Sequence, residues 1–376
     1  MTNATDYRQT IGIIGGGQLG KMLAQAAKQR GHQVIILDPT PNCPAAQVSD
    51  SQIEAEYDDQ NAMKKLAAAC DKITYEFENI DKEAAETILT PEVFPQGLTS
   101  LAKNQDRLIE KAEIQSLGLK TVPWEKVTQL NELNETLEKI GYPAVLKTTR
   151  FGYDGKGQYV IKAKQDIEKA QELLTSGPCI LEGWLDFDYE ASLIIGRNPS
   201  GDTTLFPIGK NTHVNNILHL SEAGDTSISD AVISEIHQAG EKLAHHLELV
   251  GVMGVEFFIK DNQVYVNEIA PRPHNSGHWT IEACPLSQFD IHIKALLNEP
   301  LPKRIPLFKP AVLVNILGQH LEGANRLLTQ NEYCLWSFHD YGKAEARENR
   351  KMGHFTIIGD SLEEIKEAIA ATQIWS

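Results

Sequence analysis

The sequence predicts several domains of the α/β and α+β classes, and three observations carry this prediction. The chain has 376 residues, which exceeds the usual size of one compact domain, and 41% of them are hydrophobic. Through residues 11–37, short apolar runs alternate with a helical pattern, as in a parallel α/β unit. Beyond Pro123, short strands are joined by glycine-rich turns. We therefore expect two or three domains, and we assign three, at residues 1–105, 106–186 and 187–376.

The first unit is expected to start with a strand at 11–14, a helix at 21–30 and a strand at 34–37. Gly31 is typical of the residue that ends a helix. A charged amphipathic segment at 101–117 predicts one further helix, and Gly118 with Pro123 marks the boundary that follows it.

In the second unit the pattern predicts helices at 130–140 and 167–174 and strands at 144–147, 158–161 and 179–182. In the third unit a helix at 229–247 precedes a hairpin of two strands, 252–260 and 263–269. A last helix begins near Leu362, where Ser361 and Glu364 have the spacing of a capping box.

Composition narrows the function classes. The formal charge of −16 argues against binding nucleic acid through a broad basic surface. The five cysteines form no C-x-x-C pair, which argues against a zinc site, and we expect buried free thiols. The polar first residues do not resemble a signal peptide, and no apolar run is long enough to span a membrane. A cytoplasmic protein with no membrane partner is expected.

The first glycine cluster, residues 15–20, reads Gly-Gly-Gly-Gln-Leu-Gly between a strand and a helix, with Asp38 after the next strand. This matches the G-x-G-x-x-G fingerprint, in which bare backbone lets a phosphate approach the N-terminus of a helix. Alone it allows three interpretations: a nicotinamide dinucleotide, a phosphate-bearing substrate, or a structural turn.

The second glycine cluster, residues 152–158, follows Lys147 and leads into another strand. It is no Walker A loop, because no Gly-Lys-Ser/Thr opens a helix there. Such a turn can fold over a triphosphate as a lid, with Lys147 and Lys156 supplying positive charge. An ordinary hairpin with a solvated lysine is the alternative.

The third cluster is the predicted hairpin, which carries Glu256 on one strand and Glu268 on the other. A three-residue turn would set the two acids opposite each other, whereas a two-residue turn would set Glu256 opposite Asn267. Facing carboxylates repel unless a cation lies between them, and magnesium with phosphate oxygens meets that need.

Two further groups of residues follow the hairpin. One arginine, two histidines and two small polar residues lie within residues 270–279, directly after the predicted metal acids. This density of polar side chains is typical of a site for an anionic, hydroxylated substrate. We assign His278 a structural role, since a lone histidine more often has one. Four cations lie within residues 343–351, and they form either a solvated basic loop or a phosphate clamp.

In this order the clusters resemble the ATP-grasp superfamily, which has a three-domain fold. A Rossmann-like (pre-ATP-grasp) N-terminal domain comes first, then a small lid with a glycine-rich loop, then a C-terminal domain with metal acids. Within it the chain is similar to the N5-carboxyaminoimidazole ribonucleotide synthetase family from about Ile11 to His354. The most specific match is the segment 267–280, Asn-Glu-Ile-Ala-Pro-Arg-Pro-His-Asn-Ser-Gly-His-Trp-Thr. Many ATP-grasp enzymes have asparagine where this chain has Ala270.

The resemblance implies a set of site residues. Magnesium, as two ions, is expected on Glu256 and Glu268, and Lys147, Lys156, Arg272 and His274 are the expected catalytic residues. ATP is expected to bind Arg107, Lys147, Gly152, Tyr153, Asp154, Gly155, Lys156, Gly157, Gln158, Glu182, Gly183, Trp184, Leu185, Glu190, His213, Asn267 and Glu268. The ribonucleotide is expected to bind Gln18, Leu19, Glu76, Tyr153, Asp154, Arg272, His274, Asn275 and Ser276, with its phosphate on Lys343, Arg350 and Lys351.

The resemblance also implies a reaction. Bicarbonate takes the γ-phosphate of ATP to give carboxyphosphate, which delivers its carbon to the amine of 5-aminoimidazole ribonucleotide. Because carboxyphosphate decomposes in water, a closing lid is part of the expected mechanism. Family members are typically homodimers.

Three alternatives stay open. A formate-dependent glycinamide ribonucleotide transformylase shares the three-domain plan, but residues 275–279 look like the carboxylase. A nicotinamide oxidoreductase would use the first glycine cluster and leave the other two unexplained. A non-catalytic nucleotide-binding regulator would bind ATP without turnover.

Overall fold

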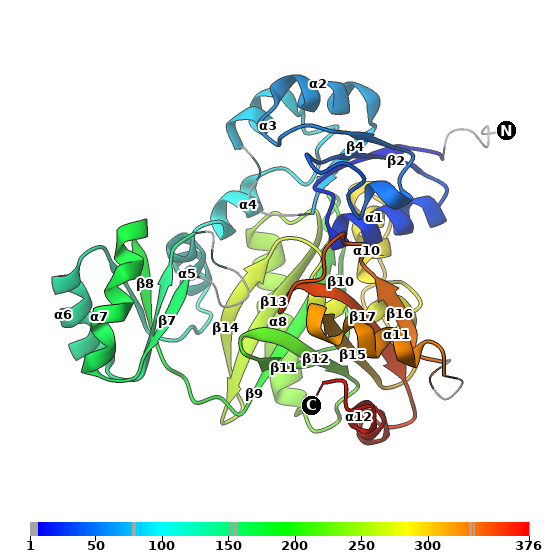
Figure 1. Ribbon diagram of the computed structural model, residues 1–376. Helices are drawn as coiled ribbons and strands as arrows, with labels where there is room; N and C mark the ends of the chain where they lie inside the picture. Colours follow the sequence, from blue (N-terminus) through cyan, green and yellow to red (C-terminus); the bar gives the residue numbers. More distant parts are fainter. Residues whose placement is uncertain are drawn as a thin grey trace.

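The computed structural model describes residues 7–76, 80, 82–150, 152, 157–330, 333 and 335–375. Over this part of the chain the strands form three sheets, one parallel and two largely antiparallel. The parallel sheet lies at the top of Figure 1, the small sheet stands apart at the left, and the largest sheet lies between them and the C-terminus. This arrangement confirms the predicted α/β and α+β class.

The parallel sheet has the strand order β3-β2-β1-β4. Its apolar strands are buried because helices cover them, and α1 (Gln18–Gln29) also packs against α10 (Gln288–Leu296) in one shared core. Gly31, at φ +88, follows α1 as predicted. The elements are β1 Thr10–Ile14, α1 Gln18–Gln29, β2 Gln33–Leu37, β3 Ser51–Ile53, α2 Gln60–Ala69, β4 Lys72–Tyr75 and α3 Lys82–Ile88.

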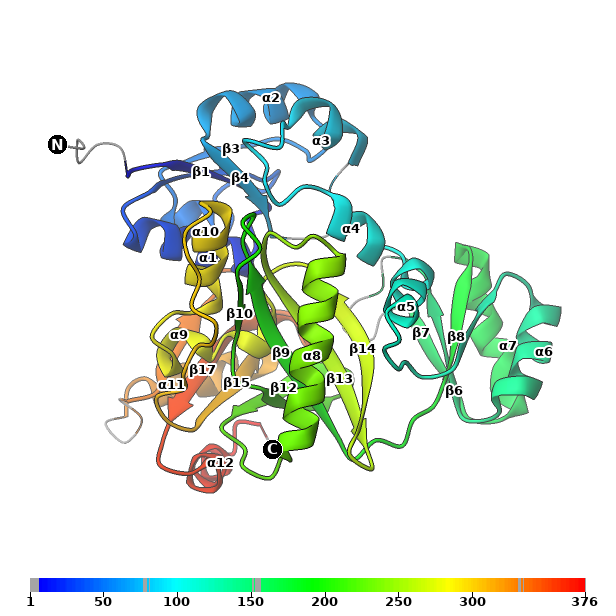
Figure 2. The same cartoon turned by 180° about the vertical axis from the view of Figure 1, so that it is seen from behind.

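The single helix predicted at 101–117 is wrong, because the segment forms two helices, α4 (Thr99–Asn104) and α5 (Arg107–Ser116). Asp106 between them is extended, and its carboxylate accepts a hydrogen bond from the backbone N–H of Leu108. That N-cap starts a new helix at Arg107. In Figure 2 α5 lies at the junction between the small sheet and the largest sheet.

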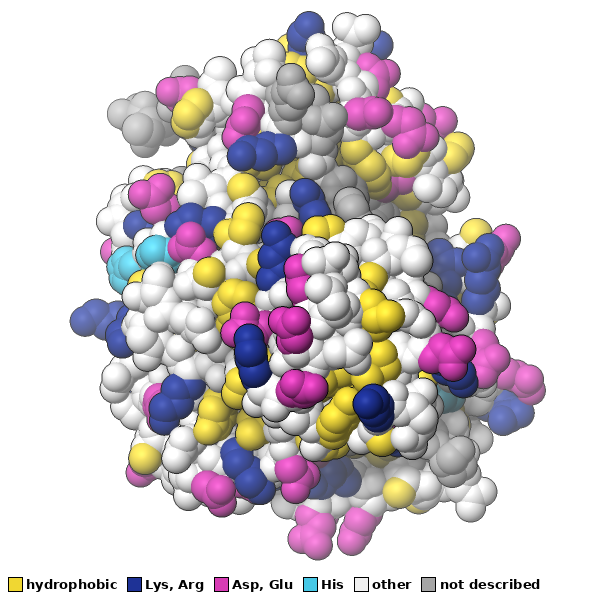
Figure 3. Space-filling model, turned by 90° about the vertical axis from the view of Figure 1, so that its left-hand side faces the viewer, with side chains coloured by type: hydrophobic (Ala, Val, Ile, Leu, Met, Phe, Trp, Pro, Cys, Tyr) yellow, Lys and Arg dark blue, Asp and Glu magenta, His cyan; other side chains and the backbone are white. Residues whose placement is uncertain are grey.

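The small antiparallel sheet has the order β5-β8-β6-β7 and is covered by two helices. The helix predicted at 167–174 is shorter and continues as a 3₁₀ turn. On the face seen in Figure 3, acidic and basic side chains are interspersed. The elements are β5 Trp124–Val127, α6 Leu130–Ile140, β6 Ala144–Thr148, β7 Gln158–Ile161, α7 Ile167–Ala170 and β8 Cys179–Gly183.

The largest sheet has nine strands over the described residues, in the order β14-β13-β9-β11-β12-β15-β17-β16, with β10 beside β9. Its strands are β9 Tyr189–Arg197, β10 Thr203–Leu205, β11 Gly209–Val214, β12 Ile217–Ala223, β13 Gly251–Lys260, β14 Gln263–Ala270, β15 Ala311–Leu317, β16 Ser337–Asp340 and β17 Lys351–Ile358. Helices α8 Asp230–His246, α9 Thr280–Ala283, α10 Gln288–Leu296, α11 Leu321–Leu327 and α12 Leu362–Ala371 pack around it.

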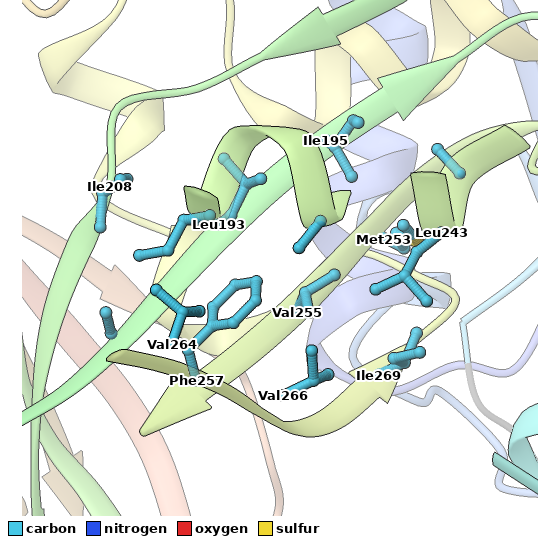
Figure 4. Close-up of a cluster of buried hydrophobic side chains, with 14 of the residues drawn as sticks. Leu193, Ile195, Ile208, Leu243, Met253, Val255, Phe257, Val264, Val266 and Ile269 are labelled. Atoms are coloured by element: carbon cyan, nitrogen blue, oxygen red, sulfur yellow. The ribbon is translucent and has the colours of Figure 1, made fainter. Parts of the chain in front are cut away.

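Apolar side chains of β9, β13 and β14 pack against α8, and Figure 4 shows Phe257 at the centre of this cluster with Leu193, Val255 and Val264 around it. Because these residues alternate along their strands, the opposite face of the same strands is left for polar side chains. Within the described ranges no helix is both long and apolar enough to cross a bilayer. Four cysteines in them are buried and free, namely Cys43, Cys70, Cys179 and Cys284.

Candidate active site

The first glycine cluster is occupied by the chain's own carboxylates. The backbone N–H of Gly16 donates to Asp38 Oδ2 at 2.7 Å. Glu76 accepts from the N–H of Gly17 at 2.7 Å and from that of Gly20 at 3.1 Å. A dinucleotide would need these N–H groups for its pyrophosphate and Asp38 for its ribose. The arrangement therefore argues against a nicotinamide site at this turn.

The hairpin brings Glu256 and Glu268 opposite each other. The turn is the two-residue pair Asp261–Asn262, both with positive φ, and that turn alone would pair Glu256 with Asn267. A β-bulge between the turn and the acids shifts the register by one residue. The expectation that a two-residue turn excludes the Glu256–Glu268 pair is wrong, because it left out the bulge.

Two residues of α5 that sequence reasoning missed lie against the bulge. Lys111 Nζ donates to the carbonyl oxygen of Asn267 at 2.7 Å, and Glu110 Oε1 accepts from the N–H of Ile269 at 2.6 Å. Glu110 and Lys111 are each 2% exposed. Their sequence gave little signal, since an adjacent acid and base in an amphipathic helix usually lie on its solvent face.

Cations from α5 and from the small sheet converge on two acids. Lys147 Nζ lies 2.5 Å from Glu182 Oε2, and Lys111 Nζ lies 3.2 Å from the other oxygen of that carboxylate. Burial alone would raise the pKa of Glu182, but the two ammonium groups hold it well below its usual range. Arg107 bridges Glu268, at 3.3 Å, and the carbonyl oxygen of Gly152, also at 3.3 Å.

An acid–histidine pair lies on the neighbouring strands. His213 on β11 contacts the carboxylate of Glu190 on β9 through Nδ1. Burial alone would lower the pKa of His213, but the bond to Glu190 and the charge of Glu256 hold it above its usual value. Burial raises the pKa of Glu256, and the nearby Glu268 and Glu190 raise it further. Burial and the neighbouring carboxylates therefore disfavour the ionised form of Glu256.

His274 closes the other side of the carboxylate pair, with Nε2 3.7 Å from Glu256 Oε1. Its main chain is held by the amide of Gln288, which accepts from His274 N at 2.9 Å and donates to His274 O at 2.8 Å. Burial, with the charges of Arg272 and Lys351, lowers the pKa of His274 to about 3. The ring is therefore neutral, and Gln288 is a second residue that sequence reasoning missed.

The side chains after His274 are largely bound within the protein. Asn275 exchanges two amide hydrogen bonds with Asn315, and the carbonyl oxygen of Ser276 accepts from Ser221. His278 is fully buried with its Nδ1 3.0 Å from the side-chain amide of Gln288, which agrees with the structural role expected for it.

Among the expected substrate residues of the N-terminal part, Glu76 lies within reach of the charge of Arg272. Gln18 begins α1 at the glycine turn. The side chain of Leu19 is packed in the core, so its main chain alone could face a ligand. Lys351 begins β17, and its charge acts on Glu256, His213 and His274.

The other basic residues lie on the loop before β17. Lys343 Nζ donates to the carbonyl oxygen of Lys351 at 2.8 Å, and Arg350 donates to that of Glu345 at 2.9 Å. Arg347 pairs with the side chain of Glu345. Lys343 and Lys351 are therefore linked to each other, whereas Arg347 lies in an exposed acid–base pair.

Comparisons with known proteins cover nearly the whole chain. Residues 8–105 match the ribonucleotide synthetase preATP-grasp domain, residues 112–289 the ATP-grasp domain, and residues 311–368 the phosphoribosylaminoimidazole carboxylase C-terminal domain. An N5-carboxyaminoimidazole ribonucleotide synthase from Staphylococcus aureus (strain COL) is 41% identical over 373 residues, which are 98% of either chain. The chain belongs to the N5-carboxyaminoimidazole ribonucleotide synthase family.

Solved structures of N5-carboxyaminoimidazole ribonucleotide synthases have the same fold. The ADP complex of one such synthetase is 46% identical with a TM-score of 0.94, covering 98% of this chain and 97% of its own. The Aspergillus clavatus enzyme in complex with ADP and 5-aminoimidazole ribonucleotide is 30% identical with a TM-score of 0.89, covering 97% and 98%. The predicted class, an ATP-grasp ligase, is confirmed.

The structure describes part of the glycine-rich loop, residues 152–158. Tyr153, Asp154, Gly155 and Lys156 lie outside the described residues. Gly157 has φ +70 and sits against Thr148, and Gln158 pairs in register with Lys147. The linker after β8 leaves Trp184 half exposed and Leu185 partly buried.

Proposed function

We propose that this chain carboxylates the amine of 5-aminoimidazole ribonucleotide with bicarbonate and ATP, giving N5-carboxyaminoimidazole ribonucleotide, ADP and phosphate. The observation that carries the proposal is the pair of carboxylates, Glu256 and Glu268, aligned across a hairpin with Arg107 and His274 on either side. The names of the relatives over the full length support the substrate.

The carboxylate pair fits magnesium. Burial and the neighbouring carboxylates raise the pKa of Glu256, and a hard cation between the facing acids would stabilise their ionised forms. In the described ranges no group of three or more His, Cys, Asp and Glu side chains could hold a metal. We propose two ions on Glu256 and Glu268, completed by phosphate oxygens and water. When bound, they would neutralise charge on the β- and γ-phosphates.

The cations of α5 and β6 fit the nucleotide. We propose that Arg107 and Lys147 bind its phosphates, with the loop 152–158 above them and with Glu182, Gly183, Trp184, Leu185, Glu190, His213 and Asn267 around the rest of ATP. Arg107 already lies between Glu268 and the loop, at Gly152. A planar guanidinium there can bind phosphate with two hydrogen bonds.

The carboxyl transfer needs two displacements. An oxygen of bicarbonate attacks the γ-phosphorus and ADP leaves, so that carboxyphosphate forms. The amine nitrogen then forms a bond to the carboxyl carbon, phosphate leaves with the C–O electron pair, and the nitrogen gives up one proton. We propose that Arg272 and the neutral His274 orient the carboxyl group between the metal acids and Glu76, with Lys156 of the loop enclosing it.

The ribonucleotide is proposed to lie between the N-terminal sheet and β17. Gln18, Leu19 and Glu76 would face it from one side, and Arg272, His274, Asn275 and Ser276 from the other, with Tyr153 and Asp154 of the loop. Its phosphate would bind Lys343, Arg350 and Lys351, of which Lys343 and Lys351 are already linked. We also propose domains at 1–105, 106–186 and 187–376, a homodimer, and a cytoplasmic location.

The test is ADP release by the purified chain with ATP, magnesium and bicarbonate. Stimulation by 5-aminoimidazole ribonucleotide, and none by glycinamide ribonucleotide with formate, is the expected result. Stimulation only by the second pair would assign the chain as a transformylase. ATP binding with no turnover under either condition would favour the nucleotide-binding regulator.

A further inference from the structure

Strand β14, which carries Glu268, is the edge strand of the largest sheet. Its inner edge pairs with β13, and its outer edge has no strand beside it among the described residues. Backbone N–H and C=O groups on such an edge need other partners when they are buried. The bulge at Asn267 adds to this need, because it disrupts the ladder at the residue before Glu268.

Helix α5 supplies partners on both sides of Glu268. The carboxylate of Glu110 accepts from the N–H of Ile269, and the ammonium group of Lys111 donates to the carbonyl oxygen of Asn267. The residue before Glu268 and the residue after it are thus each held by a side chain that is 2% exposed. Adjacent residues of one helix therefore replace the missing strand at this point.

The same helix also contacts the acid itself. Arg107, one helical turn before Lys111, lies 3.3 Å from Glu268, and Lys111 reaches Glu182 on β8 of the small sheet. Helix α5 therefore links the bulge, the second carboxylate and the strand that carries Glu182.

We infer that Glu110 and Lys111 are positioning residues, which hold the bulge of β14 and so keep Glu268 opposite Glu256. Without the bulge the two-residue turn pairs Glu256 with Asn267, and Glu268 points to the opposite face of the sheet. The hydrogen bonds from α5 to main-chain atoms of β14 select the register in which both acids face the same side of the sheet. This inference deepens the proposed function, since it rests on the proposal that these acids hold the metal.

The experiment compares four variants of the full chain. Glu110→Leu removes the acceptor for Ile269, whereas Glu110→Gln keeps an acceptor oxygen of the same reach. Lys111→Met keeps the length of the side chain and removes its ammonium group. Glu113→Leu is the matched control, because Glu113 lies on the same helix and pairs with Lys103 and His246 nearer the surface.

The first readout is the affinity for manganese in the presence of ADP, measured by electron paramagnetic resonance. The affinity for ADP without metal is the reference, because it shows whether a variant still binds the nucleotide. We expect Glu110→Leu and Lys111→Met to weaken manganese binding by about tenfold to a hundredfold, the range for residues that orient metal ligands. Glu110→Gln and Glu113→Leu should stay within about twofold of the unmodified chain. Equal manganese affinity in Glu110→Leu and Glu110→Gln would overturn the inference.

The second readout needs no metal. Hydrogen exchange of the Ile269 amide should accelerate in Glu110→Leu and stay unchanged in Glu113→Leu, because only the first loses its acceptor. If the unmodified chain binds no manganese, the proposed metal site is wrong. Hydrogen exchange alone then tests whether Glu110 holds the main chain of β14. An unchanged exchange rate at Ile269 in Glu110→Leu would overturn the positioning role of Glu110. This test does not depend on whether Lys111→Met folds.

Discussion

At the scale of the residue, Glu268 lies between charges of both signs. Arg107 contacts its carboxylate, and burial raises the pKa of this acid less than the nearby cations lower it, so the group stays ionised. Glu256 has the opposite balance, with a raised pKa. Neighbouring acids whose pKa values are shifted in opposite directions are typical of catalytic and ligand-binding sites.

Glu268→Gln keeps the shape of the side chain and removes its charge. We expect ADP release to fall by at least about a hundredfold, since a neutral amide is a poor ligand for magnesium and stabilises less charge on the phosphates. The measurement is single-turnover ADP formation at saturating ATP, with the melting temperature recorded for each protein.

Glu235→Gln serves as the control, because Glu235 is exposed on α8. Its activity should equal that of the unmodified chain. Normal turnover by Glu268→Gln in a folded protein would contradict the assignment of Glu268 to the metal.

The sequence predicted both acids of this pair and left open the register in which they meet. The two-residue turn at Asp261–Asn262 was one of the two turns considered, yet the bulge that aligns the acids depends on Glu110 and Lys111, which lie far away in the sequence. The sequence pattern around the hairpin cannot predict a contact with such a distant segment. The expected ligands could therefore be named from sequence, and the residues that position them could not.

At the scale of the element, β4 of the parallel sheet and α10 of the C-terminal part are joined by a chain of buried hydrogen bonds. The backbone N–H of Val252 donates to His292 Nδ1, so the ring proton lies on Nε2 and points to Thr74 Oγ1 at 2.8 Å. The hydroxyl of Thr74 donates to Gln96, whose amide donates to the carbonyl oxygen of Pro271. Both ends fix the direction, because Val252 N–H only donates and Pro271 C=O only accepts.

Thr74→Val removes the hydroxyl and keeps the shape of the side chain. His292 Nε2–H and Gln96 Oε1 then lose a partner in a buried place, so we expect the free energy of unfolding to fall by about 1–3 kcal/mol. Urea unfolding measures this change. Arg272 follows Pro271, so the apparent KM for the ribonucleotide should rise more than that for ATP.

Thr204→Val is the matched control. Thr204 is fully buried, and its hydroxyl has no hydrogen-bond partner in the described part of the chain. Replacing it with a methyl group should leave stability unchanged or raise it. A loss in Thr74→Val no larger than that in Thr204→Val would contradict the role of the hydrogen-bond chain.

Elements with a clear period were predicted well, and those that depend on a single cap were not. The helix at 130–140 and the strand at 158–161 have the predicted bounds. The helix at 101–117 breaks because Asp106 caps α5, a choice between a helix interior and a cap that the amphipathic pattern does not distinguish.

At the scale of the whole molecule, three domains were expected from the sequence, but not how the sheets of the chain pack together. The parallel sheet shares a core with α10, in which Leu23 and Ile36 pack with Phe289 and Ile293. Such contacts join segments far apart in the sequence, and no local pattern specifies them. Packing of this kind also encloses polar side chains, and the histidines are the clearest case.

His278, His292 and His354 are fully buried in the joined structure. Burial lowers the pKa of His292 to about 3 and lowers the pKa of His278 and His354 well below the usual value of 6.5. In the unfolded chain these groups bind protons below about pH 6.5, whereas in the folded chain they stay neutral. The contribution of these neutral rings to the free energy of unfolding is therefore fully present above about pH 6.5 and is lost as the pH falls below it.

Each of these histidines takes up close to one proton on unfolding at pH 5, which costs about 1.4 kcal/mol per pH unit. These three histidines together contribute a fall of about 4 kcal/mol per pH unit near pH 5, which the raised pKa values of Glu256 and His213 partly offset. Urea unfolding at pH 8, 7, 6 and 5 measures the slope. His292→Gln should reduce the fall by about 1.4 kcal/mol per pH unit, while His245→Gln, at an exposed position of α8, should leave it unchanged. Equal slopes in His292→Gln and the unmodified chain would mean that the ring of His292 is protonated in the folded chain, which its enclosure by the joined sheets does not permit.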